Sequence, residues 1–263
     1  MLKNISLHPK LLAVLDCVAN LALLWWLKQA SSWLVIGMWI FFRLVLWAIA
    51  LRLVYHTPEI SRLKHFVSLL FLSFGVLSYL LFIEWDLAWK LFGATFIFFS
   101  AFSFWILPAS NVQFVSFVKP HLRWKFIMCI IGMAGIFQAV GAITSFQIAY
   151  TVSVWVWIFI TAFLSSIIAG WWWREYGIEF SPRFWKWVGA WFVLTFELVW
   201  VVQILPLGHL VSSVLLIWFW YMTWLLARFN LSQEGINWKK QIVFLGSNVV
   251  LLLTFLIFIV RWK

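Results

Sequence analysis

Long apolar segments alternate with short polar segments along the whole chain. Each apolar segment is about 20 residues long, the length that an α-helix needs to cross the hydrocarbon core of a bilayer. The apolar residues are continuous and do not alternate with polar ones, which is typical of membrane helices rather than of the strands of a membrane barrel. The pattern therefore predicts an all-α, polytopic transmembrane helical bundle.

The apolar segments predict nine membrane spans within one integral membrane domain, residues 1–263. The first span is the shortest and the least apolar, because it contains Asp16 and Asn20. The expected spans are Leu11–Leu27, Ser32–Leu51, Phe66–Ile83, Leu87–Leu107, Phe126–Ile143, Ala149–Gly170, Trp187–Leu205, His209–Ala227 and Gln241–Val260.

Basic residues are distributed unevenly between the two sets of connecting segments. If the N-terminus is cytoplasmic, four basic residues face outward, and these are Lys28, Lys90, Arg261 and Lys263. Fourteen then face the cytoplasm: Lys3, Lys10, Arg52, Arg62, Lys64, Lys119, Arg123, Lys125, Arg174, Arg183, Lys186, Arg228, Lys239 and Lys240. Cytoplasmic loops carry such an excess of Lys and Arg, so we predict an N-in, C-out topology. We expect the plasma (inner) membrane as the location.

Four of the inner segments resemble one another in sequence. They are Arg62–Phe66, Arg123–Phe126, Arg183–Trp187 and Trp238–Ile242. Their lysines at 64, 125, 186 and 240 are separated by 61 (125 − 64), 61 (186 − 125) and 54 (240 − 186) residues. The spacing is consistent with four parallel helical hairpins after the first helix, an arrangement found in transporters. A simple alternation of short outer and longer inner loops produces the same spacing, so both interpretations stay open.

The composition excludes a soluble protein. The chain is 65% hydrophobic and 10% charged, with a mean hydropathy of +1.02, and a soluble fold of this composition would expose large apolar patches. A net charge of +11 could indicate nucleic-acid binding, but the basic residues lie in short turns and form no continuous face. We therefore expect the protein to contact the lipid bilayer and not a nucleic acid.

Tryptophan is abundant, with 23 residues in the chain. Fourteen of them fall near the expected membrane–water interfaces: Trp25, Trp26, Trp33, Trp85, Trp89, Trp105, Trp124, Trp171, Trp172, Trp173, Trp185, Trp187, Trp238 and Trp262. An indole ring combines an apolar body with one N–H donor, which suits the headgroup layer. We interpret these residues as an anchoring belt rather than as a ligand-stacking surface.

Three ionisable residues lie deep in the expected spans: Asp16, Arg43 and Glu197. At 1.5 Å per residue they lie about 8, 13 and 15 Å from the inner face. Such residues pair with one another or mark substrate and ion pathways. Because the first two spans form a hairpin, we expect Asp16 to pair with Arg43, with Glu197 either protonated or a third member. Two interpretations of these residues stay open: a polar path for a substrate or ion, and a purely structural ion pair.

The basic inner turns are candidates for contact with anionic lipid headgroups. The residues concerned are Arg62, Lys64, Arg123, Lys125, Arg183, Lys186, Lys239 and Lys240. The positive-inside rule already accounts for basic residues at these positions, and it is the simpler explanation.

No motif for catalysis, nucleotide binding or metal binding is found. The chain contains no P-loop, HExxH or GxSxG sequence, and its histidines form no metal-type pair on a helix. Cys17 and Cys129 lie inside expected spans, where small apolar packing residues are common. We expect no catalytic residue, metal or cofactor.

Three functional hypotheses follow. The first is a non-enzymatic scaffold, assembly factor or subunit that acts through helix and lipid packing, with a membrane-protein partner or by self-association. The alternative is a small-molecule or ion transporter that uses a buried cluster of Asp16, Arg43 and Glu197. A lipid-modifying enzyme using Arg62, Arg123 and Arg183 ranks last, because a nucleophile and an acid–base pair are missing.

Overall fold

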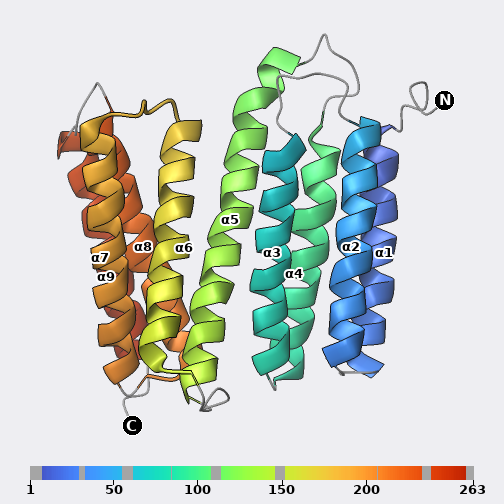
Figure 1. The fold of residues 1–263 in the computed structure, drawn as a ribbon, viewed down its shortest axis with the longest axis horizontal. Coiled ribbons are helices and arrows are strands. Elements are labelled where there is room, and N and C mark those ends of the chain that lie inside the picture. The colour runs from blue at the N-terminus through green and yellow to red at the C-terminus, as the bar shows by residue number, and fades with distance from the viewer. Residues whose placement is uncertain are drawn as a thin grey trace. The chain divides into compact units, whose positions relative to one another are not determined.

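The computed structural model describes residues 8–29, 33–54, 62–83, 85–107, 114–145, 152–205, 207–232 and 238–258. Throughout these ranges the chain is all-α, as the sequence predicts, with nine helices (Figure 1). They are α1 (Pro9–Gln29), α2 (Trp33–Val54), α3 (Arg62–Phe82), α4 (Asp86–Trp105), α5 (Phe114–Ser145), α6 (Val154–Glu175), α7 (Pro182–Ile204), α8 (His209–Leu231) and α9 (Trp238–Phe258).

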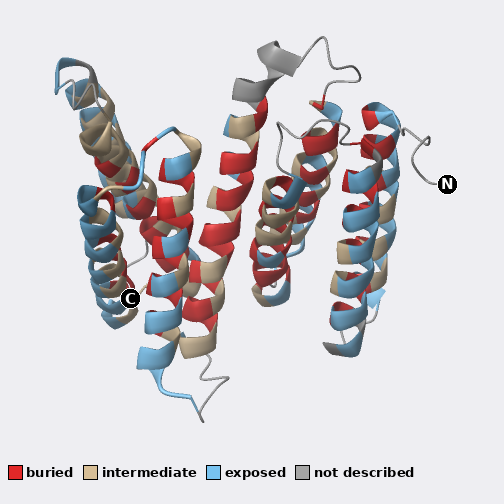
Figure 2. Ribbon diagram, turned by 45° about the horizontal axis from the view of Figure 1, so that its top comes forward, coloured by how far each residue is buried: buried red, intermediate tan, exposed pale blue. Residues whose placement is uncertain are grey.

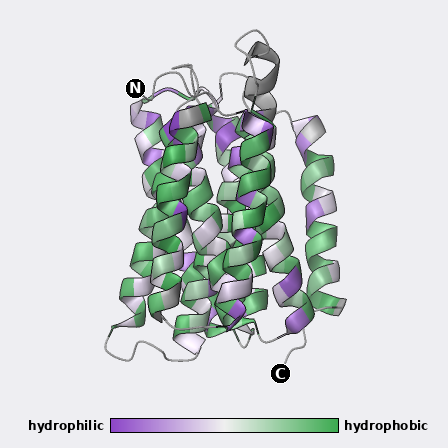
Figure 3. Ribbon diagram, turned by 90° about the vertical axis from the view of Figure 1, so that its right-hand side faces the viewer, coloured by the Kyte–Doolittle hydropathy of each residue, from purple (hydrophilic) through white to green (hydrophobic). Residues whose placement is uncertain are grey.

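Among the described residues, seven helices are long and apolar enough to cross a membrane. They are α1, α3, α4, the part of α5 from His121 to Ser145, α6, α7 and α8, and α9 contains a shorter apolar helix, Gln241–Ile257. Figure 3 shows hydrophobic residues along most of the length of the helices, and the exposed positions on them are often large and apolar, whereas a soluble protein is polar there. The chain is therefore a multi-pass integral membrane protein, whereas nine crossings and the N-in orientation stay predictions.

The chain divides into two compact units, Met1–Gly132 and Met133–Lys263, with the boundary inside α5. Most helices have a buried side and an exposed side (Figure 2). The exposed sides are rich in large apolar residues, and lipid chains can solvate such residues in a membrane. The single domain expected from the sequence stays a prediction.

In the first unit, four helices surround a common core. The helix α1 packs against both α2 and α4, and α3 packs against the same two helices. The helix α5 also lies against α3, with Gly132 near Gly75. A Cβ atom added to Gly75 would lie 2.6 Å from the Cα atom of Gly132, so the two backbones can approach this closely only without side chains.

In the second unit, α7 packs against α6 and α8. The turn between α6 and α7 is fixed by caps at both ends. Gly177 has a φ of 83°, and the N–H groups of Gly177 and Ile178 donate to the carbonyls of Arg174 and Trp173, closing α6 with a Schellman motif. Ser181 then accepts a hydrogen bond from the Phe184 N–H, an N-cap that begins α7.

The observed helices extend four or more residues beyond the predicted span limits in α3, α5, α6, α7 and α8. The helix α5 begins at Phe114 rather than at Phe126, so Pro120 lies inside the helix and not at its end. Pro120 is the seventh residue of α5, beyond the first turn, so it removes one backbone hydrogen bond inside the helix at a cost of about 3 kcal/mol or more. The helix α6 continues past Gly170 to Glu175, while the start predicted at Ala149 lies outside the described residues.

The extension of α6 changes the interpretation of two tryptophans. Trp172 and Trp173, which we placed at the interface, are fully buried among the helices of the second unit. The Trp173 indole N–H donates to the Trp224 carbonyl at 3.4 Å, and its ring meets the Trp191 ring edge-on. These two residues therefore belong to the core of the unit and not to an anchoring belt.

Candidate functional site

The helix α1 presents its polar residues on its buried side. Asp16 and Asn20, one turn apart, lie on the same face as Leu12 and Leu24 and are buried with them. On α2, Arg43 is buried and lies one turn from Trp39 and Trp47. The two charged residues therefore face the core of the first unit from neighbouring helices.

Asp16 and Arg43 form a buried ion pair. The Nη1 atom of Arg43 lies 3.0 Å from the Oδ1 atom of Asp16. Arg43 is 1% exposed and Asp16 is 7% exposed. An isolated charge at this depth would be strongly unfavourable, and a direct hydrogen-bonded pair removes much of that cost.

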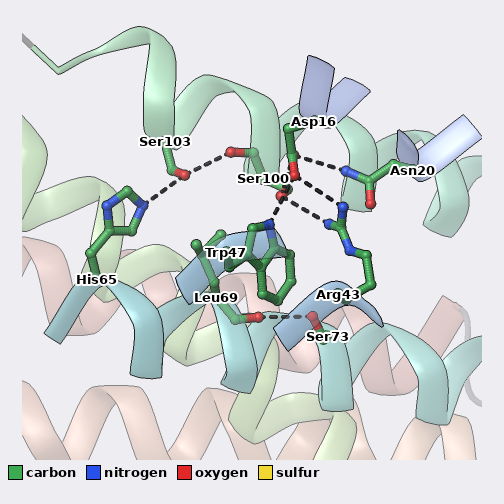
Figure 4. Close-up of polar contacts among 9 residues, drawn as sticks. All are labelled: Asp16, Asn20, Arg43, Trp47, His65, Leu69, Ser73, Ser100 and Ser103. Atoms are coloured by element: carbon green, nitrogen blue, oxygen red, sulfur yellow. Dashed lines mark hydrogen bonds and ion pairs between the residues drawn. The ribbon is translucent and has the colours of Figure 1, made fainter. Parts of the chain in front are cut away.

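Every acceptor position of the Asp16 carboxylate is occupied (Figure 4). Oδ1 accepts from Arg43 and from the Trp47 indole N–H at 2.8 Å, and Oδ2 accepts from the Asn20 amide at 2.9 Å and the Ser100 hydroxyl at 2.6 Å. A carboxylate offers about four lone-pair sites, so none is left for a further ligand. The donors come from α1, α2 and α4, and the carboxylate thus joins three helices.

The Arg43 guanidinium makes further contacts in the same cluster. Its Nη2 atom donates to the Ser100 hydroxyl at 3.3 Å, and its Cζ atom lies 4.1 Å from the centre of the Trp47 ring and 5.3 Å from that of Phe96. Aromatic faces attract a guanidinium when water is excluded. Within the described residues, Arg43 Nε and Asn20 Oδ1 have no hydrogen-bond partner.

A second polar group continues from Ser100 toward the start of α3. The Ser103 hydroxyl donates to the Ser100 carbonyl at 2.6 Å and lies 2.9 Å from His65 Nε2. The His65 ring contacts the His121 ring edge-on, with centroids 5.1 Å apart. Lys125, on the same helix as His121, is 5% exposed. These side chains extend the polar region from α4 to α3 and α5.

A cavity of about 180 Å³ lies beside the ion pair, between α1 and α2. Apolar residues make up most of its wall, among them Leu15, Leu46 and Ile49. Asp16 and Arg43 also border it, but the Asp16 oxygens are already fully hydrogen-bonded. The cavity therefore offers apolar volume next to a polar group that has little remaining capacity to bind.

Glu197 lies in a different setting from the ion pair. It belongs to α7 in the second unit, and its side chain is exposed. No hydrogen bond or ion pair of Glu197 occurs within the described part of the chain. The structure does not join it to Asp16 and Arg43, so a three-residue path stays a prediction.

The basic residues considered for lipid contact fall into different environments. Arg62, Arg123, Arg183, Lys186 and Lys239 are exposed, Lys64 is partly buried, Lys125 is buried, and the side chain of Lys240 lies outside the described residues. Arg183 donates to the carbonyl and the side-chain oxygen of Asn230. The burial of Lys125 sets it apart from the residues that can reach a headgroup.

Among the described residues, no group of three His, Cys, Asp or Glu side chains is close enough to hold a metal ion. Cys17 and Cys129 form no disulfide, and Cys129 is buried with its sulfur 3.7 Å from the Ser68 hydroxyl. Within the described residues, the first unit contains the buried Asp16–Arg43 ion pair and two exposed pairs in which Asp86 contacts Lys28 and Lys90.

Sequence analysis alone identified Asp16 and Arg43 but not the residues that complete their site. Ser100, Trp47 and Ser103 are small or aromatic residues of ordinary type for a membrane helix, and only the packing of α4 against α1 brings Ser100 to Asp16. One signal in the sequence could have indicated this contact: Ser100 and Ser103 lie three residues apart, on one side of a helix that is otherwise rich in aromatic residues.

Comparison of the chain with known protein families, with curated proteins and with solved structures gave no match.

Proposed function

We propose that the protein is a non-enzymatic membrane scaffold, assembly factor or subunit that acts through packing of its helices with lipids and with a membrane-protein partner. The observation that carries this proposal is the filled coordination of Asp16, whose four hydrogen bonds all come from the protein itself. A substrate that binds to Asp16 would need a free acceptor position on the carboxylate, and all of them are filled. Arg43 Nε and Asn20 Oδ1, elsewhere in the cluster, have no hydrogen-bond partner within the described residues.

The extent of exposed apolar helix surface supports the same proposal. Large apolar side chains are exposed on α1, α2, α7 and α9, and such surfaces can pack against lipids and other membrane helices. We propose the plasma (inner) membrane as the location, with all of residues 1–263 acting as one membrane domain. The exposed basic residues Arg62, Arg123, Arg183, Lys186 and Lys239 are the proposed contacts with anionic headgroups.

The transporter hypothesis has one observation in its favour, the cavity of about 180 Å³ beside Asp16 and Arg43. It requires Glu197 to be part of the same path. In proteoliposomes with a pH-sensitive dye inside, a proton-coupled transporter would carry protons in its native form and lose this flux on Glu197→Gln. Equal flux in both forms would remove the hypothesis.

The proposed structural role of the ion pair is tested by three variants: Asp16→Leu, Arg43→Leu and the double variant. Each single change leaves one buried charge without its partner and is expected to cost about 3–5 kcal/mol of stability. The double change removes both charges, so it is expected to recover part of that loss, while Trp47, Asn20 and Ser100 still lack the acceptor that Asp16 provided. The measurements are thermal unfolding in detergent and the recovery of partner proteins after crosslinking in native membranes.

The proposal requires the double variant to keep its crosslinked partners at the level of the native protein. If the double variant folds but loses all of them, the ion pair has a direct role in function, and a purely structural assignment is wrong. A native protein that forms no crosslinks to another chain in its own membrane would contradict the scaffold function itself.

A further inference from the structure

Glu197 is an acidic residue in the middle of an apolar membrane helix, and its side chain is exposed. It lies eleven residues after Lys186, or about 16 Å along the helix axis. A carboxyl group facing lipid hydrocarbon is unfavourable, and such residues in membrane helices almost always face protein or water. The exposure of Glu197 therefore indicates that something outside the described contacts covers this side of α7.

The residues around Glu197 form a continuous exposed face of α7. Lys186, Ala190, Val193, Val201 and Ile204 all point within about 40° of Glu197 at 100° per residue, and all five are exposed. We call these five residues and Glu197 the Glu197 face.

The opposite side of α7 packs against the other helices of the second unit. Trp191 packs against the rings of Trp173 and Trp220, and the Thr195 hydroxyl lies 3.1 Å from the Ser165 hydroxyl. Because these contacts fix the rotation of α7 about its axis, the Glu197 face points away from α6 and α8.

A glycine next to this face is not needed by the chain's own packing. A Cβ atom added to Gly189 would meet no atom within 4 Å. By contrast, a Cβ atom added to Gly170 on α6 would lie 3.2 Å from the Val188 side chain. Gly189 and Ala190 leave room at the start of the Glu197 face for another helix backbone to approach closely.

We propose that the Glu197 face docks a transmembrane helix of another protein, one that carries Arg or Lys at the depth of Glu197. This inference rests on the proposed scaffold function and names the surface through which it acts. A basic side chain complements the carboxylate and removes the cost of leaving it in hydrocarbon. Arg43 cannot serve, because it already pairs with Asp16. A second copy of α7 would place Glu197 against Glu197, which brings like charges together.

The test uses the purified full-length protein in liposomes and three synthetic peptides, each an apolar Leu/Ala helix of membrane-spanning length. The peptides carry Arg, Leu or Glu at the central position and are otherwise identical. Energy transfer between labelled protein and labelled peptide measures association. The Arg peptide is expected to bind about tenfold more tightly than the Leu peptide, since a polar interhelical contact in a bilayer is worth about that factor.

Two variants test whether the preference for the Arg peptide depends on Glu197. Glu197→Leu is expected to lower binding of the Arg peptide to the level of the Leu peptide, and Glu197→Arg is expected to prefer the Glu peptide. Glu179→Leu is the matched control, because Glu179 is exposed in the turn before α7, outside the Glu197 face, and its loss should leave peptide binding unchanged.

Binding of the Arg peptide that survives Glu197→Leu would overturn the proposal, as would equal binding of the Arg and Leu peptides. Association of the protein with itself that needs Glu197 in the absence of peptide would also overturn it, in favour of a second copy as the occupant. The experiment involves neither Asp16 nor Arg43, so its failure leaves the ion-pair test of the scaffold function to be judged separately.

Discussion

At the scale of single residues, the core of the first unit depends on how the buried carboxylate of Asp16 is hydrogen-bonded. Asp16 accepts hydrogen bonds from four side chains, and Arg43 is held by Asp16, Ser100 and two aromatic faces. Such a network is worth more than a sum of isolated pairs, because each partner also orients the others. Its members are therefore expected to respond strongly to small changes.

Ser100 gives a precise residue-scale prediction. Its hydroxyl donates to Asp16 and accepts from Arg43, so Ser100→Ala leaves one position on each charged group unfilled. We expect a loss of about 1–3 kcal/mol in unfolding free energy, measured by denaturation in detergent. The matched control is Ser247→Ala, since the Ser247 hydroxyl is exposed and bonds only to the Phe244 carbonyl within the described residues. Equal stability of the two variants would contradict the role assigned to Ser100.

The sequence predicted part of this network and missed the rest for a physical reason. Asp16 and Arg43 come from consecutive helices, so a hairpin was enough to predict their contact. Ser100 is 84 residues from Asp16, and its contact depends on α1 packing against α4, which no local pattern encodes. Lys125 was assigned to the headgroup region from its place in a basic turn. Its burial depends on the packing of α5 in the first unit, which the sequence does not show.

At the scale of helices, close backbone contact between α3 and α5 organises one side of the first unit. Gly75 and Gly132 face each other, and a Cβ atom added to Gly132 would lie 2.6 Å from the Phe71 carbonyl oxygen. A backbone atom cannot move aside as a flexible side chain can, so the two helices would have to separate.

Gly132→Ala is therefore expected to destabilise the protein by about 1–3 kcal/mol, the usual cost of overpacking. Gly37→Ala on α2 is the matched control, because a Cβ atom there meets nothing within 4 Å, and alanine favours the helix. Thermal unfolding of both variants in the same detergent measures the difference. A Gly132→Ala protein as stable as the control would show that α3 and α5 do not pack in this way.

Several helices extend beyond the predicted apolar spans into the basic segments that flank them, as at the starts of α3 (Arg62) and α7 (Pro182). The start of α8 at His209 agrees with the sequence-based limit. The limits of α5 and α6 differ because α5 continues backward through Pro120 and α6 continues forward through Trp172 and Trp173. Helices that are apolar on all sides also give no signal of which side is buried, so their packing partners could not be predicted.

At the scale of the whole molecule, we predict that the chain crosses the bilayer nine times with its basic connecting segments on one side. The composition and the seven long apolar helices establish a multi-pass membrane protein. The number nine and the orientation are predictions from the charge distribution: nine crossings with the N-terminus inside would put fourteen basic residues on one side and four on the other. The depths assigned to Asp16, Arg43 and Glu197 depend on the same count.

The most direct test is the accessibility of tags placed at the two termini of the full-length protein in intact cells and after permeabilisation. An odd number of crossings places the termini on opposite sides, so the C-terminal tag is expected to react with an impermeant reagent in intact cells. The N-terminal tag is expected to react only after permeabilisation. Reaction of both tags in intact cells, or reaction of neither tag before permeabilisation, would place the termini in one compartment and contradict nine crossings.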